Sequence, residues 1–183
     1  MQPTACDALM DIVQNAFESG AAEVRVEVAR RGSRWEAEVR DDGCGMDEAT
    51  LRKALDPFWT DGRKHPGRKV GLGLPFVRQA AEQCGGAFGI ESAPGRGTVV
   101  RFGFDLSNVD APPTGDMAGT LSALMAWPGE REVAVRREED GRTYEVRRTE
   151  LAEALDGLEG AGSLALMKEF FSSNEREIGK HEV

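Results

Sequence analysis

The first segments of the chain change from helical to strand-like spacing of apolar residues. A stripe recurring every three to four positions predicts a helix and comprises Leu9, Ile12, Val13, Ala16 and Phe17. Thr4 and Asp7 are spaced as a capping box at its start, and Gly20 is placed to end it. The alternating runs EVRVEVAR and RWEAEVR follow, and the turn RRGS between them predicts a hairpin.

The next stretch predicts two more helices and a second hairpin. DEATLRKAL has helical spacing, and VGLGLPFVRQAAEQCGG predicts a helix that begins and ends at glycines. AFGIES and TVVRFGFDL, joined by the turn APGRG, predict two paired strands. We therefore expect an α+β fold, a mixed but mostly antiparallel sheet with helices on one face.

A polar segment, SNVDAPPTG, has the composition of a linker. It divides the chain into a first domain (1–108), a linker (109–115) and an α/β extension (116–183) that we expect to pack on the first domain. In the extension, the spacing predicts helices at 117–127, 149–158 and 163–176 and a hairpin across Asp140-Gly141. Its apolar positions favour additional core over a partner site, although Phe170 and Phe171 could cover a sheet edge or mediate a homodimer.

Composition argues against several classes of function. The 183 residues carry a net charge of −9, which disfavours nucleic-acid and anionic-membrane partners. Three cysteines without metal-ligand spacing indicate a reduced chain, and two histidines leave little material for a transition-metal site. No apolar run reaches the length of a membrane span, and the first residues lack a signal peptide's charged and hydrophobic regions. We expect a cytoplasmic protein.

Two adjacent aspartates end the second predicted strand. Trp35, Ala37 and Val39 share one face by the period of two, so Asp41 should point into the interior and Asp42 outward. A buried carboxylate is costly unless donors surround it. The glycines that follow, in DDGCGM, allow another group to lie close to the backbone. Asp41 could accept from the exocyclic amine of a purine, or it could cap the next turn through backbone N–H groups.

Asp11 and Asn15 lie four residues apart on the first predicted helix, off its apolar stripe. A carboxylate and a carboxamide at this spacing could orient a water and bind Mg²⁺, which prefers oxygen ligands. A solvated helix face explains the same pair, and in isolation it is the better explanation.

Gly71 and Gly73 open a later helix, where free N–H groups and the helix dipole favour an anion. The basic residues just before them could form a lid over phosphates or simply be solvated; they are Arg63, Lys64, Arg68 and Lys69. Either way, this segment should be a mobile loop.

The order of these motifs resembles the GHKL (Bergerat-fold) ATPases, which include histidine kinases, gyrase-type topoisomerases and MutL mismatch-repair proteins. The motifs are DIVQNA, DDGCGM, DPFWT, GLGL and ESAPGRGTVVRF, and the resemblance spans roughly residues 5–106. It is specific because the boxes occur in the family's order. It implies an ATP-binding domain that uses ATP and Mg²⁺.

The resemblance assigns roles by position. Asn15 would bind Mg²⁺, and Asp11 would occupy the place of a water-activating glutamate. Asp41 would accept from the adenine amino group. The remaining nucleotide-binding positions would be Gly43, Gly45, Met46, Phe58, Thr60, Lys69, Gly71, Leu72, Gly73, Leu74 and Thr98.

Several positions depart from the family pattern. Asp11 is one methylene shorter than glutamate, Glu18 stands where kinases often carry a phosphate-binding lysine, and Lys69 replaces a glycine. His65 and His181 lie outside any helix pair that could present a phosphoacceptor, so we expect a kinase-like ATP-binding domain without a phosphoacceptor domain. It would hydrolyse ATP or transfer phosphoryl to a protein partner. The alternative is a non-catalytic interaction module whose lid is ordered by nucleotide.

Overall fold

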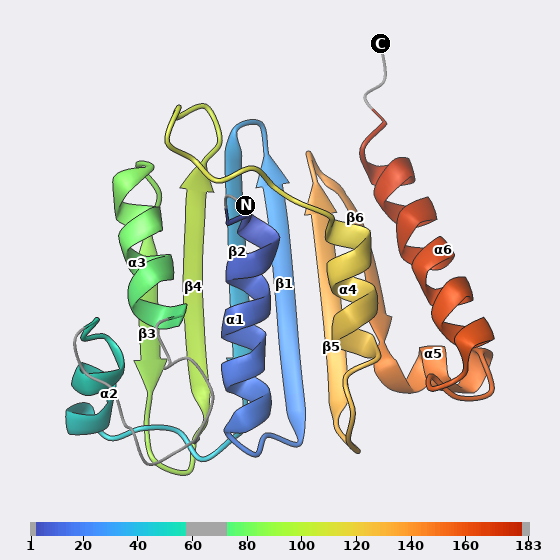
Figure 1. The fold of residues 1–183 in the computed structure, drawn as a ribbon, viewed down its shortest axis with the longest axis horizontal. Helices are drawn as coiled ribbons and strands as arrows, with labels where there is room; N and C mark the ends of the chain where they lie inside the picture. The colour runs from blue at the N-terminus through green and yellow to red at the C-terminus, as the bar shows by residue number, and fades with distance from the viewer. Residues whose placement is uncertain (1–2, 58–72, 181–183) are drawn as a thin grey trace.

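The computed structural model of the chain describes residues 3–57 and 73–180. Within these residues the centre of the fold is a six-stranded sheet in the order β3-β4-β2-β1-β5-β6 (Figure 1). The strands are β1 (Glu23–Arg31), β2 (Arg34–Asp41), β3 (Phe88–Ser92), β4 (Thr98–Asp105), β5 (Glu132–Glu139) and β6 (Arg142–Arg147). Neighbours run antiparallel except β1 and β5, which pair in parallel. The predicted mixed, mostly antiparallel sheet is confirmed.

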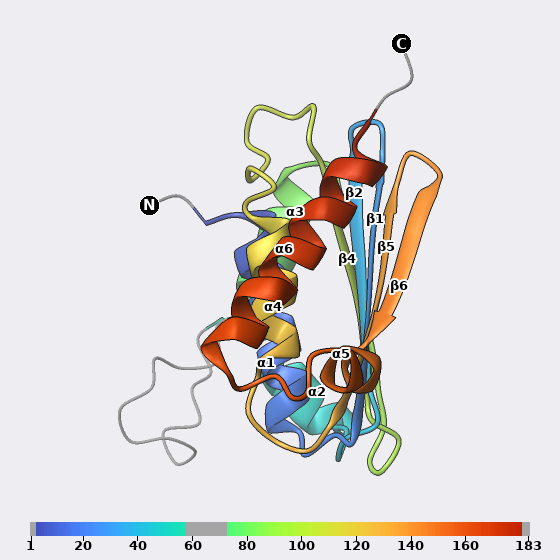
Figure 2. The same ribbon diagram turned by 90° about the vertical axis from the view of Figure 1, so that its right-hand side faces the viewer.

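The longer helices of the described chain form one layer over this sheet. They are α1 (Ala5–Glu18), α3 (Gly73–Gln83), α4 (Met117–Met125) and α6 (Ala161–Ile178). Figure 2 shows this layer edge-on, with the opposite sheet face uncovered by any described helix. Two short helices, α2 (Glu48–Ala54) and α5 (Arg148–Ala154), lie at one end of the sheet. No helix in the described part of the chain combines the length and apolar character needed to cross a membrane.

Helix α1 forms where its apolar spacing and capping residues predict it. The Thr4 hydroxyl accepts from the Asp7 amide at 3.0 Å, and the Asp7 carboxylate accepts from the Thr4 amide at 2.8 Å, which confirms the capping box. Gly20 follows the helix with a positive φ of 78°. The whole predicted apolar stripe is buried. This packing turns Asp11 and Asn15 to the exposed side of the helix.

The segment after residue 115 continues the same sheet. β5 pairs with β1 along eight residues, from Glu23↔Glu132 to Arg30↔Glu139. Its buried apolar side chains belong to the same core cluster as those of α1 and β2; they include Leu121, Leu124, Met125, Val133, Val135, Met167 and Phe171. Phe170, by contrast, remains partly exposed. The division into domains at 109–115 stays a prediction.

The predicted linker and the segment after it contact the two ends of α1. At the start of the helix, the Ala5 amide donates to the Pro113 carbonyl at 2.9 Å. At its end, Arg131 donates through Nη1 to the Phe17 carbonyl at 2.9 Å, and its guanidinium lies 4.8 Å from the centre of the Phe17 ring. Both contacts satisfy helix-end groups that have no partner inside the helix.

Helix α5 begins one residue before the predicted 149–158 helix and ends earlier, at Ala154. Asp156 and Gly157 adopt positive φ angles of 54° and 102°, so the chain leaves the helical conformation before residue 158. The Asp140-Gly141 turn is confirmed, with φ angles of 46° and 87° joining β5 to β6.

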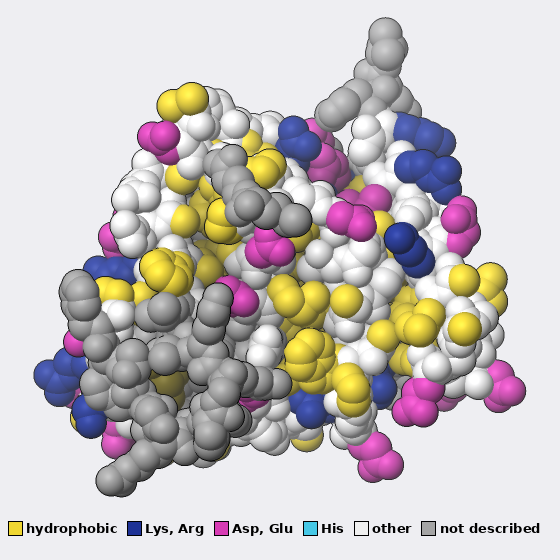
Figure 3. Space-filling view, viewed as in Figure 1, with side chains coloured by type: hydrophobic (Ala, Val, Ile, Leu, Met, Phe, Trp, Pro, Cys, Tyr) yellow, Lys and Arg dark blue, Asp and Glu magenta, His cyan; other side chains and the backbone are white. Residues whose placement is uncertain are grey.

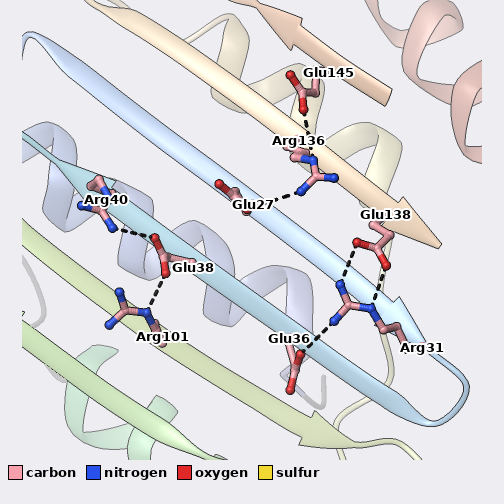
Figure 4. Close-up of polar contacts among 9 residues, drawn as sticks. All are labelled: Glu27, Arg31, Glu36, Glu38, Arg40, Arg101, Arg136, Glu138 and Glu145. Atoms are coloured by element: carbon pink, nitrogen blue, oxygen red, sulfur yellow. Dashed lines mark hydrogen bonds and ion pairs between the residues drawn. The ribbon is translucent and has the colours of Figure 1, made fainter. Parts of the chain in front are cut away.

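The uncovered sheet face carries rows of charged side chains that pair within and across strands (Figure 4). Glu38 accepts from Arg101 at 2.6 Å and from Arg40 at 3.2 Å, and Arg31 bonds to Glu138 on β5 at 2.7 Å. Most of these side chains are substantially exposed, so each pair contributes little, typically about 1 kcal/mol or less. The polar face is solvated, and the buried carboxylate of β2 points to the other side of the sheet.

Candidate functional site

Asp41 lies at the end of β2 with its side chain on the helix-covered face. It is 8% exposed, and Trp35, Ala37 and Val39 on the same face are also buried. Asp42 is exposed and accepts from the Ala22 amide at 2.8 Å. The inward and outward orientations predicted from strand alternation are confirmed.

The Asp41 carboxylate receives two hydrogen bonds on one oxygen. Oδ1 accepts from the Gly43 amide at 2.9 Å and from the Ser19 hydroxyl at 3.1 Å. Burial raises the pKa of Asp41, while these two bonds and one from the Thr98 backbone act against that rise. The predicted cap of the next turn is therefore present, with Asp41 Oδ1 accepting from the Gly43 amide.

Thr98 begins β4 directly opposite Asp41 in the β2–β4 pairing. Its hydroxyl lies 2.9 Å from the Ser92 hydroxyl, which also accepts from the Met46 amide at 2.8 Å. Three of the predicted binding residues, Asp41, Met46 and Thr98, thus lie around one pair of strand ends. Ser92 was not singled out from the sequence, although its register opposite Thr98 follows from the predicted hairpin.

The glycines around Asp41 are required by close contacts within the protein. A Cβ on Gly43 would lie 1.8 Å from the Ser19 hydroxyl oxygen. Gly45 has a positive φ of 62°, and a Cβ there would lie 2.0 Å from the Ala93 carbonyl oxygen. We expected another group to lie close to the backbone at Gly43 and Gly45. On the side where a Cβ would point, that group is part of the protein itself.

The second cluster joins α1 to the start of α3. A Cβ on Gly73 would lie 3.2 Å from the Cβ of Asp11, so this glycine brings the helix start against the carboxylate. Partial burial, followed by the negative charge of Asp7, raises the pKa of Asp11. Asn15 is exposed one helical turn further along. Leu74, also predicted at the site, is buried in the core.

The remaining predicted positions lie outside the described residues. They are Phe58, Thr60, Lys69, Gly71 and Leu72, together with the basic residues Arg63, Lys64 and Arg68.

The model of one family, described as histidine kinase-, DNA gyrase B-, and HSP90-like ATPase, matches residues 2–108. This match covers more than half of the chain. The chain belongs to this ATPase family. The resemblance inferred from the motif order is confirmed.

Curated relatives of this ATPase-family chain include bacterial sensor kinases. It is 32% identical over 140 residues to the sensor histidine kinase AruS of Pseudomonas aeruginosa, covering 71% of this chain and 14% of the relative. It is 31% identical over 121 residues to the histidine-protein kinase AfsQ2 of Streptomyces coelicolor, covering 65% of this chain and 22% of the relative. The chain therefore matches only a small part of each relative's length.

Among solved structures, the nucleotide-free catalytic domain of histidine kinase ThkA is 25% identical, with a TM-score of 0.42. That similarity covers 54% of this chain and 63% of the solved one. The mycobacterial sensor histidine kinase MprB is also 25% identical, with a TM-score of 0.40, over 53% of this chain and 66% of that one.

Membership of this ATPase family implies ATP binding, and Mg²⁺ is the metal typical of such sites. The described residues contain no group of three or more His, Cys, Asp or Glu side chains arranged to hold a metal. Mg²⁺ is commonly bound by one or two protein oxygens together with substrate phosphates and waters. The exposed Asn15 amide, with Asp11 on the same helix, fits that sparse donor set.

Proposed function

We propose that the chain binds Mg-ATP between α1, the end of β2 and the start of α3, and that it hydrolyses the nucleotide or transfers its terminal phosphoryl group to a protein partner. The observation that carries this proposal is the buried Asp41 carboxylate at the end of β2. A buried acceptor group opposite Thr98 suits the exocyclic amine of adenine. The family match supports ATP as the ligand.

Asp41, Thr98, Asn15 and the start of α3 then have separate roles in binding. Asp41 accepts from the base, and Thr98 lies beside it on β4. Asn15 would hold the metal ion, which would neutralise phosphate charge. The N-terminal turn of α3 supplies free N–H groups to the phosphates.

Asp11 is the candidate general base. Its raised pKa strengthens it as a proton acceptor for an attacking water or hydroxyl. Its position against Gly73 puts it beside the helix start that would face the phosphates. Phosphoryl transfer depends mainly on positioning and charge neutralisation, so a single carboxylate in this place is sufficient acid–base chemistry.

A turnover assay with purified protein and Mg-ATP tests the catalytic part of the proposal. We expect phosphate release that falls to background in Asp11→Asn, with ATP affinity largely retained. Equal rates for the two proteins would contradict a catalytic role for Asp11. Binding without any turnover above the Asp11→Asn control would leave an ATP-binding module without hydrolytic activity.

That second function, a nucleotide-gated interaction module, is favoured by apolar side chains exposed on α6. Leu164 is 41% exposed, Leu166 59% and Phe170 37%. Figure 3 shows apolar side chains gathered over the start of α6 on the helix-covered face. Exposed apolar groups of this kind are common at protein contacts. Retention of a partner protein only with ATP, by a chain that does not hydrolyse ATP, would favour this function.

A further inference from the structure

Ser19 links the three parts of the proposed nucleotide site. It caps α1, and its amide donates to the Asn15 carbonyl at 3.0 Å. Its carbonyl accepts from the Cys44 amide at 3.1 Å, in the loop after β2. Its hydroxyl lies 3.1 Å from Asp41 Oδ1. One residue therefore touches the metal-binding helix, the glycine-rich loop and the buried carboxylate.

The local packing is shaped around the Ser19 hydroxyl. A Cβ on Gly43 would lie 1.8 Å from that oxygen and 2.9 Å from Asp41 Oδ1. Gly43 does not have a positive φ, so its backbone conformation does not require glycine. The glycine is required because the serine hydroxyl occupies the space of a side chain.

The hydroxyl carries one proton and has two acceptors within reach. The Ala16 carbonyl lies 2.7 Å from it, and Asp41 Oδ1 lies at 3.1 Å. With its proton directed at Asp41, the hydroxyl and the Gly43 amide together hold the carboxylate from two sides at one oxygen. These two hydrogen bonds restrict the rotation of the Asp41 carboxylate and so define the orientation of Oδ2.

We propose that Ser19 is a positioning residue that fixes the Asp41 carboxylate as an acceptor and thereby sets the preference for adenine over purines with an exocyclic carbonyl oxygen. This proposal rests on the proposed function, and it adds a specificity role to a residue that contacts Asp41. An ionised carboxylate accepts from the adenine amine, whereas it faces the carbonyl oxygen of hypoxanthine as one acceptor against another. A carboxylate without the serine donor can rotate or take up a proton, and a protonated carboxyl can donate to that oxygen.

The test is calorimetric measurement of Mg-ATP and Mg-inosine-triphosphate affinities for the wild type, Ser19→Ala and Ser19→Cys. Loss of a hydrogen bond to a charged group should weaken ATP binding by roughly tenfold. Inosine triphosphate binding should change less, so the ratio of the two affinities should fall by a similar factor. Ser19→Cys places a slightly larger thiol that donates only weakly, so its ratio should fall even if Ser19→Ala does not fold.

Ser19→Thr keeps the hydroxyl and should restore the wild-type ratio. A purely structural role would weaken both nucleotides equally in Ser19→Ala and Ser19→Cys, and an unchanged ratio in these variants would overturn the proposal. Failure of the wild type to bind ATP at all would instead overturn the proposed function, so the two failures are distinguishable.

Discussion

The proposed chemistry of the site depends on Asp41, a buried carboxylate whose ionisation in the folded protein costs free energy. Asp41 is buried, and its raised pKa means that ionisation in the folded protein is disfavoured relative to an exposed aspartate. A fold selected for stability alone would place an apolar or amide side chain at this position. Keeping a carboxylate there is consistent with a requirement for an acceptor, because a neutral amide presents both a donor and an acceptor.

Asp41→Asn should therefore lose nucleotide binding. The amide can place its N–H₂ group against the adenine amine, which replaces an acceptor with a donor and leaves a mispaired buried group. Such a loss typically costs about 1–3 kcal/mol, roughly tenfold or more in affinity. Calorimetric titration with Mg-ATP measures it. As a control, Asp42→Asn alters the exposed neighbour and should bind nearly as the wild type does; equal affinities for all three proteins would contradict the role of Asp41.

The same variant should not be less stable than the wild type without nucleotide. Because the pKa of Asp41 is raised in the folded state, the penalty of ionising it is fully present above that pKa. The penalty disappears as the pH falls, since the folded protein takes up the proton before the unfolded chain does. The free energy of unfolding of Asp41→Asn should match or exceed that of the wild type at neutral pH.

Denaturant unfolding of both proteins at neutral and acidic pH checks this sign. The wild type should gain stability relative to Asp41→Asn on acidification. The opposite trend would show that the folded state lowers the pKa of Asp41.

The burial of Asp41 and its cap of the next turn could be predicted from the sequence, whereas its contact with Ser19 could not. Burial follows from strand alternation, which depends only on neighbours along the chain. The contact with Ser19 joins residues 22 positions apart and depends on how α1 packs against the sheet. Gly43 is visible in the sequence, but the reason for it is the hydroxyl of Ser19.

At the scale of elements, the segment that follows β4 contacts both ends of α1. The predicted linker provides the Pro113 carbonyl that accepts from the first turn of α1, and Arg131 binds the last turn. The linker was predicted from its Pro and Gly content, which indicates irregular backbone but not what that backbone contacts. Since α1 carries Asp11 and Asn15, these contacts belong to the support of the proposed site.

Arg131→Ala should lower both stability and ATP affinity. It removes the hydrogen bond to the Phe17 carbonyl and the cation–π contact with the Phe17 ring, together worth about 1–3 kcal/mol. Loosening of the last turn of α1 should also shift Ser19 and Asn15. Thermal unfolding and calorimetry measure the two effects.

Arg136→Ala is a matched control on the uncovered sheet face, where Arg136 pairs with Glu145 at 3.0 Å and Glu27 at 4.0 Å (Figure 4). It should change stability by about 0.5 kcal/mol or less and leave ATP affinity unchanged. Equal effects of Arg131→Ala and Arg136→Ala would contradict a role for Arg131 in holding α1.

At the scale of the whole molecule, the sheet does not divide where the sequence predicts a domain boundary. The helix and strand types of the C-terminal segment were predicted from local spacing, and the family motifs indicated the residues of the proposed site. The pairing of β5 with β1 could not be predicted, because the elements from β2 to α4 separate the two strands along the chain and a distant parallel neighbour leaves no signature in either strand. β1 is flanked by β2 and β5, so its apolar residues Val24, Val26 and Val28 are fully buried only in the complete sheet.

A chain ending at residue 108 should therefore not fold as the complete protein does. It would lose the hydrogen bonds between β1 and β5, the contacts at both ends of α1 and the apolar cover provided by α4 and α6. We expect a broad thermal transition, rapid proteolysis and no measurable ATP binding, although the fragment contains every predicted nucleotide-binding residue. The exposed edge of β1 and its uncovered apolar side chains should also make the fragment prone to aggregation.

Addition of a separate 109–183 fragment is the control that distinguishes missing contacts from missing chemistry. If the C-terminal segment acts by completing the sheet and holding α1, the two fragments together should recover a cooperative transition and part of the ATP affinity. Recovery should fail with an Arg131→Ala fragment, because that fragment lacks the contact with the last turn of α1. A 1–108 fragment that unfolds cooperatively and binds ATP as tightly as the full chain would show that the first domain is complete without the extension.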